Sequence, residues 1–150
     1  MKFYRKHIHI GYSSASVPGG WVKRVEEALI EIEREMWPRW MPMFLKRWIH
    51  YLATGNSVVR IKYRWAYNLR TKLTGGQIVR DVKDKYAQLR IYASAGEKIN
   101  DIIDKAVYDC EGICERCSGT ENVSVVGRGW YENLCENCYV PVREILLEKY

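Results

Sequence analysis

The chain has 150 residues, of which 47% are apolar and 28% charged, and its formal net charge is +6. This composition excludes a disordered chain, and the absence of an 18-residue apolar run excludes a membrane-spanning helix. The positive charge favours anionic partners, because the summed field raises their local concentration and association rate. The N-terminus has no apolar signal segment, so we expect a soluble cytoplasmic protein with reduced thiols and no membrane partner.

The first 54 residues predict one strand and two helices. Residues 3–12 alternate apolar and polar side chains, as a half-buried strand does, and residues 13–20 are rich in Ser, Pro and Gly and predict a loop. Apolar residues at spacings of three and four predict a helix over 22–36, which Pro38 ends. A second helix begins near Pro42. Its predicted apolar face contains Phe44, Leu45, Trp48, Ile49 and Leu52.

Residues 57–67 predict another strand, because aliphatic and aromatic side chains alternate with polar ones. We expect one face of this strand to be buried in the core. The opposite face would carry three cations, which are Arg60, Lys62 and Arg64.

A hairpin and a helix are predicted next. Residues 77–83 and 88–94 have the composition of two strands joined by a tight connection over 84–87. Apolar residues then recur with helical spacing over 99–110. Cys110 continues this apolar stripe, so we interpret it as a buried hydrophobic residue rather than a fifth metal ligand.

Two C-x-x-C pairs separated by seventeen residues are the strongest chemical signal. They contain Cys114, Cys117, Cys135 and Cys138. This spacing is typical of a four-thiolate zinc ribbon, with a hairpin around Gly127–Gly129 between the pairs. Because all four ligands are sulfur, the predicted Zn²⁺ site is structural and has no position for an activated water. A disulfide framework is the alternative, and the missing export signal argues against it.

The predicted fold class is α+β: a small antiparallel sheet packed with two or three helices, plus a C-terminal zinc ribbon and a short terminal helix. The α+β body would comprise residues 1–110, and the ribbon with its terminal helix residues 111–150. The terminal helix would begin near Val142 and dock on the body through Ile145 and Leu146.

The block Val82–Tyr92, VKDKYAQLRIY, followed by Ile113–Cys117, ICERC, resembles a family of small uncharacterised phage and prophage proteins. Those proteins have a K-x-K-[FY]-G-x-L-R-[FY]-Y block, a C-x-x-C ribbon and a Gly-Trp pair near the start, such as Gly20-Trp21. Ala87 and Ser118 stand where the family has glycine. The resemblance, over about two-fifths of the chain, implies a phage-type accessory protein in the host cytoplasm and the zinc ribbon, but no activity.

No arrangement of residues predicts catalysis. His7 and His9 share one face of the first predicted strand, but a two-histidine phosphodiesterase needs a second such motif. The remaining histidine, His50, lies in a helical pattern without one, and no phosphate-binding glycine loop is present. We therefore predict that the protein is not an enzyme.

Cationic and aromatic residues predict a binding surface instead. The cations of 57–67 would share a sheet face with Arg90 and Tyr92 if the two strands pair, and Lys83 and Lys85 would lie at the same corner. Guanidinium groups match phosphate oxygens in pairs, and an aromatic ring can stack on a base. The predicted ligand residues are Arg60, Lys62, Arg64, Lys83, Lys85, Arg90 and Tyr92. The alternative is a solvated sheet face.

Three functions are consistent with these features. The first, which we predict, is an anti-defence sponge: an oligomeric phage protein that sequesters an anionic nucleotide-type ligand such as a cyclic nucleotide signal of host immunity, and the other two are alternatives. The second is a zinc-ribbon protein that binds DNA or RNA through its basic strands. The third is an inhibitor that binds a host protein through exposed tryptophans.

Overall fold

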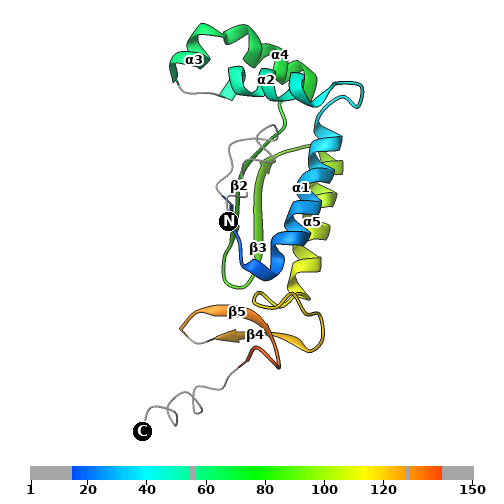
Figure 1. Ribbon diagram of the computed structural model, residues 1–150, viewed down its shortest axis with the longest axis vertical. Helices are drawn as coiled ribbons and strands as arrows, with labels where there is room; N and C mark the ends of the chain where they lie inside the picture. Colours follow the sequence, from blue (N-terminus) through cyan, green and yellow to red (C-terminus); the bar gives the residue numbers. More distant parts are fainter. Residues whose placement is uncertain (1–14, 55–56, 128, 140–150) are drawn as a thin grey trace.

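The computed structural model describes residues 15–54, 57–127 and 129–139, and it has three parts along its longest axis (Figure 1). A central body lies between a group of helices at one end and a two-stranded ribbon at the other. The predicted α+β class with a C-terminal four-cysteine ribbon is confirmed. The predicted strand over 3–12 and the predicted terminal helix over 142–150 lie outside the described residues.

The body consists of two helices packed on one face of a sheet. The helices are α1 (Val22–Met36) and α5 (Glu97–Glu111), and the main strands are β2 (Ile78–Asp84) and β3 (Leu89–Ser94). Both helices and the β2–β3 hairpin agree with the predicted elements. The core between these layers includes Val25, Leu29, Ile32, Val79, Val82, Leu89, Ile99 and Ile103.

The segment before α1 is more ordered than the predicted loop. Residues Ala15–Ser16 form β1, which pairs parallel to β2, and Gly19–Trp21 form a 3₁₀ turn, η2. The Trp21 side chain is fully buried, and its indole N–H donates to the carbonyl of Ile113 at 2.8 Å. This hydrogen bond fixes the start of α1 to the loop that follows α5.

The β2–β3 connection is a two-residue turn. Lys85 and Gln88 exchange backbone hydrogen bonds of 2.9 and 3.2 Å, and φ is +57° at Tyr86 and +59° at Ala87. Positive φ at both central residues is the geometry of a type I′ turn, which usually contains Asn and Gly. The sequence does not supply these residues, so other contacts must support the turn.

Residues 57–67 are helical, so the predicted strand is wrong. They form α3 (Ser57–Lys62) and the start of α4 (Arg64–Thr74), which packs antiparallel to α2 (Met43–Thr54). The side chains buried along α4 are Ala66, Arg70 and Thr74, which recur every four residues. Packing against α2 therefore overrides the strand propensity of the alternating sequence.

The ribbon contains β4 (Val123–Gly127) and β5 (Tyr131–Cys135), which pair antiparallel as predicted. Within the described residues, no helix is both long and apolar enough to cross a bilayer.

Candidate functional site

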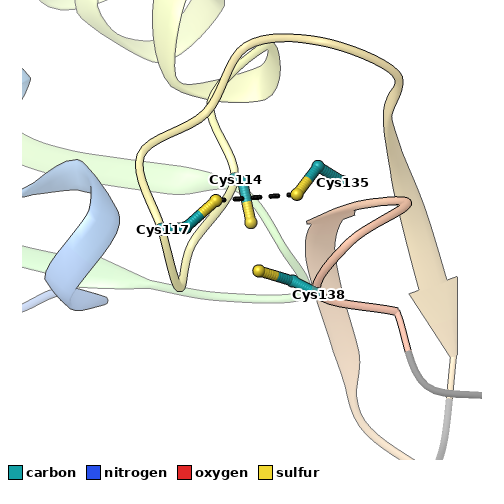
Figure 2. A group of neighbouring side chains, drawn as sticks. All are labelled: Cys114, Cys117, Cys135 and Cys138. Carbon is teal, nitrogen blue, oxygen red and sulfur yellow. Dashed lines mark hydrogen bonds between the residues drawn. The ribbon is translucent and has the colours of Figure 1, made fainter.

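Four cysteine side chains converge at the ribbon (Figure 2). Cys114 and Cys117 lie in the loop after α5, Cys135 ends β5, and Cys138 follows in the next turn. Their sulfur atoms lie within 4.8 Å of one another, and the Sγ atoms of Cys117 and Cys135 are 3.5 Å apart. A tetrahedral zinc site with Zn–S bonds of about 2.3 Å would place its sulfurs about 3.8 Å apart. The donor set therefore fits a single metal ion.

Each pair of cysteines is held by a tight backbone turn. The Ser118 N–H donates to the Cys114 carbonyl at 3.0 Å, and the Tyr139 N–H donates to the Cys135 carbonyl at 3.0 Å. The Gly119 N–H also donates to Cys117 Sγ at 3.4 Å, which helps to fix the position of that sulfur. Ser118 has φ of +64°, where a side chain is unfavourable.

The thiols perturb each other's ionisation. Burial raises the pKa of Cys114, but hydrogen bonds from the backbone of Cys117, Cys135 and Arg116 outweigh it and lower that pKa to about 6. Hydrogen bonds to Cys117 and Cys135, followed by burial, raise the pKa of Cys138 to about 12. One thiolate is therefore stabilised while another thiol keeps its proton, so four thiolates at neutral pH require a bound cation.

The ribbon is fixed to the body at two points. At the first, the Gly20 N–H donates to the Glu115 carbonyl at 2.8 Å, beside the Trp21 hydrogen bond to Ile113. A Cβ at Gly20 would overlap the Cys114 carbonyl and lie 2.7 Å from the Glu115 carbonyl carbon. Only glycine permits this approach of the two backbones.

At the second point, Asn133 of β5 contacts the β2–β3 turn. The Asn133 side chain is buried, and its amide donates to the Ala87 carbonyl at 2.6 Å. The Asn133 backbone N–H donates to Glu115 Oε1 at 2.8 Å. Burial is the main cause that raises the pKa of Glu115 to about 7, and repulsion from Asp84 and Glu132 raises it further. The hydrogen bond from the Asn133 N–H acts in the opposite direction and lowers this pKa.

Some predicted ligand residues lie on the β2–β3 hairpin. Arg90 and Tyr92 are exposed on β3, and the Lys83 ammonium lies 4.8 Å from the centre of the Tyr92 ring. The same ammonium donates to Asp81 at 2.6 Å, which raises the pKa of Lys83. Lys85 lies in the turn, 5.4 Å from the ring centre of Tyr86.

The other predicted ligand residues are elsewhere. Lys62 ends α3 and Arg64 begins α4, both with exposed side chains, and Arg60 belongs to α3. These helices lie at the end of the molecule opposite the β2–β3 turn (Figure 1). The predicted single surface is therefore wrong, because it required residues 57–67 to be a strand beside β3.

A different feature of the sequence becomes significant with this fold. The stretch between Glu35 and Asp81 contains none of the 18 Asp and Glu residues of the chain. It contains nine of the 24 Lys and Arg residues. Most of this stretch is residues 39–76, which we call the arm. The arm contains α2, α3 and α4. In the part of the chain that the structure describes, no carboxylate forms an ion pair with Arg47, Lys62, Arg64 or Lys72.

The arm places polar groups inside and aromatic groups outside. Buried Arg70 donates to Nδ1 of buried His50 at 3.3 Å, and Lys46 pairs with Glu33 of α1 at 3.9 Å. Desolvation lowers the pKa of Arg70. Large apolar side chains of the arm are exposed, namely Trp40, Met43, Phe44, Trp48, Tyr51, Val58, Ile61, Trp65 and Tyr67. The predicted burial of Phe44 and Trp48 is wrong, since α2 turns Ile49 and Ala53 inward instead.

A hollow of about 600 Å³ lies where α1, α2 and α5 meet. Its lining residues are Glu31, Arg34, Glu35, Arg39, Lys46 and Ile102. The lining has mixed charge and includes none of the predicted ligand residues, so the hollow does not replace the predicted surface.

The ribbon has the opposite charge to the arm. Residues 111–139 contain Glu111, Glu115, Glu121, Glu132 and Glu136, against two arginines. Arg116 pairs with Glu132 at 3.1 Å. Of these two parts of the described chain, the positive one is therefore the arm and not the cysteine cluster.

Comparisons with known proteins do not assign a family. No protein-family model matches the chain, and neither a curated protein nor a solved structure gives a significant match. The resemblance to phage proteins therefore stays an expectation from the sequence.

Proposed function

We propose that this chain is a nucleic-acid-binding protein whose arm contacts the phosphate backbone and whose four cysteines hold a structural zinc ion. The observation that carries the proposal is the stretch between Glu35 and Asp81, which has nine cations and no carboxylate. A phosphate backbone is a dense line of negative charge, and Lys or Arg binding releases its condensed counterions. Among these cations, Arg47, Lys62, Arg64 and Lys72 have exposed side chains and so could contact phosphates.

Zinc is the metal that best suits the cysteine cluster. Four thiolates in tetrahedral arrangement favour Zn²⁺, and a fully occupied sulfur shell makes the ion structural. Because the ribbon is acidic and is hydrogen-bonded to Gly20, Trp21 and Ala87, its role in the proposal is to hold the body together.

Sequestration of a nucleotide signal has less support. It required Arg60, Lys62 and Arg64 to share a surface with Arg90 and Tyr92, and these groups lie on separate parts of the molecule. Capture of a host protein by exposed tryptophans explains the rings of the arm but not its lack of carboxylates. Nucleic-acid binding accounts for both the cations and the aromatic groups.

The test is the salt dependence of binding. The zinc-loaded protein should bind a labelled oligonucleotide, and the logarithm of its binding constant should fall linearly with the logarithm of salt concentration. Arg64→Ala and Lys62→Ala should each weaken binding and flatten the slope by about 0.7–0.9, the loss of one phosphate contact.

The matched controls are Lys98→Ala and Lys105→Ala, which remove exposed cations of α5 outside the arm and should leave the slope unchanged. If the arm variants and the α5 variants changed the salt slope equally, net charge alone would drive binding. Absence of binding at low salt would reject the proposed function.

A further inference from the structure

We infer that the arm selects single-stranded over double-stranded nucleic acid, by stacking unpaired bases on the exposed rings of α2 and α4. This inference rests on the proposed function and adds the class of ligand. It depends on where the aromatic side chains lie relative to the cations.

The outer face of α2 is aromatic. Phe44, Trp48 and Tyr51 recur at spacings of four and three residues, which places them on one side of the helix. They lie opposite the stripe that contains Ile49 and Ala53, which are buried. Their exposed fractions are 73%, 51% and 59%, so the rings are open to solvent. The helix therefore presents a row of flat apolar surfaces outward.

A contact between two tryptophans extends this row to α4. The ring centres of Trp48 and Trp65 are 5.7 Å apart with planes inclined at 52°, and Trp65 is 48% exposed. The inclination shows that the rings are not stacked face to face on each other. Both therefore keep exposed ring surface, and the aromatic area crosses from one helix to the next.

Cations border the rings. Arg47 precedes Trp48 and Arg64 precedes Trp65 along the chain, and both arginine side chains are exposed. A single strand offers a charged phosphate and a flat base in every nucleotide, so alternating cations and rings match its repeat. In a duplex the bases are already paired and stacked, and the rings would have no partner.

The same pattern argues against a second copy of the chain as the occupant. Two arms brought face to face would oppose like charges, since neither has a carboxylate to offer the other. The rings are also not displaced core residues, because α2 and α4 already pair through Ala66 and the buried Arg70–His50 contact. A partner that is anionic and has flat apolar groups of its own would match both the cations and the exposed rings of the arm.

The experiment measures binding of the full zinc-loaded chain to a fluorescent 20-nucleotide oligothymidine, to a duplex of the same length, and to vesicles containing anionic lipid. We expect the single strand to bind at least tenfold more tightly than the duplex and to quench tryptophan emission. Trp48→Ala should weaken single-strand binding about tenfold, in the range found for one lost stacking contact, and should change duplex binding little.

Two further variants make the result specific. Trp130→Ala removes a ring that is 74% exposed on the ribbon, and it should leave binding unchanged. Phe44→Leu keeps an apolar side chain but removes the ring, so it should weaken binding if bases stack there and have no effect if apolar burial alone matters. Because Phe44 is exposed, this variant should fold even if Trp48→Ala does not.

The outcomes separate the inference from the proposed function. Equal binding of single strand and duplex, or full binding by Phe44→Leu, would overturn the inference and leave nucleic-acid binding in place. Tighter binding to the vesicles than to the oligonucleotide, or no binding to either nucleic acid, would overturn both.

Discussion

The side-chain amide of Asn133 donates a 2.6 Å hydrogen bond to the carbonyl of Ala87, and so joins the ribbon to the β2–β3 turn of the body. Both residues are buried, and Ala87 has positive φ in a turn without glycine. An unfavourable backbone conformation persists where the surroundings over-determine it, and this contact is one such constraint. The four-cysteine ribbon thus supports the conformation of a turn 46 residues away in sequence.

Asn133→Ala should destabilise the folded protein by about 1–3 kcal/mol, because the buried carbonyl of Ala87 would lose its donor. The measurement is chemical denaturation of the zinc-loaded protein. Asn137→Ala, an exposed asparagine of the same ribbon, is the control and should change stability little. Equal stabilities for the two variants would show that the Asn133 contact is not structural.

Gly20→Ala should separate the ribbon from the body, because the new Cβ would overlap the backbone of Cys114 and Glu115. We expect a loss of about 1–3 kcal/mol or more, the cost of overpacking a contact that only backbone movement can relieve. Gly19→Ala introduces the same methyl group where no atom lies within 4 Å and should be nearly neutral. Thermal melting of the two variants compares them directly, and similar melting temperatures would refute the close approach.

Ser118→Gly should stabilise the first cysteine turn by about 0.5–1 kcal/mol, because Ser118 has φ of +64° and glycine adopts this region without steric cost. Ser124→Gly, at an exposed position in β4, should instead destabilise, since glycine weakens a strand. Denaturation of the zinc-loaded variants should therefore show changes in the free energy of unfolding that have opposite signs. A loss of stability in Ser118→Gly would contradict the assigned backbone conformation.

The five cysteines should differ in reactivity. Burial raises the pKa of Cys110 to about 12, so its thiol should resist alkylation at pH 8 in the folded protein whether or not metal is bound. The four clustered thiols should be protected by the metal and react once a chelator removes it. Counting alkylated cysteines by mass spectrometry before chelation, after chelation and after denaturation tests this order. Modification of Cys110 in the first sample would contradict its burial.

Metal binding should weaken as the pH falls. In the metal-free protein the pKa of Cys138 is about 12, so this thiol is protonated at neutral pH and must release its proton when it becomes a ligand. Lowering the pH towards the Cys114 pKa of about 6 makes a proton compete with the metal at that thiol as well. Affinity should therefore be lower at pH 5.5 than at pH 8, and calorimetry in buffers of different ionisation enthalpy should detect proton release. Binding without proton release would exclude thiolate ligation of Cys138.

Local patterns in the sequence sufficed for much of the fold. The spacing of Cys114, Cys117, Cys135 and Cys138 predicted their convergence because two short turns and one hairpin determine it. The helix over 22–36 and the hairpin over 77–94 have one strong periodicity each, and both formed as expected. In each case neighbouring residues alone define the packed face.

The arm could not be predicted in the same way. Residues 57–67 alternate like a strand, and only the continuation to Arg70 and Thr74 shows the four-residue spacing of the buried face of α4. Lys46 and His50 of α2 point inward, because they contact Glu33 of α1 and Arg70 of α4. The apolar rings on the other side of α2 are therefore exposed. Such partners are set by tertiary contacts, which a single sequence does not reveal. The absence of carboxylates between Glu35 and Asp81 was visible and would have identified the basic segment.

The acid-free arm and the acidic ribbon occupy opposite ends of an elongated molecule. Charge separated in this way gives the protein an electric dipole along its long axis. In the field of a polyanion such a dipole experiences a torque, so the molecule would arrive with α2–α4 leading and the cysteine cluster trailing. The trailing end would then remain open to solution after docking, at the greatest distance from whatever the arm has engaged.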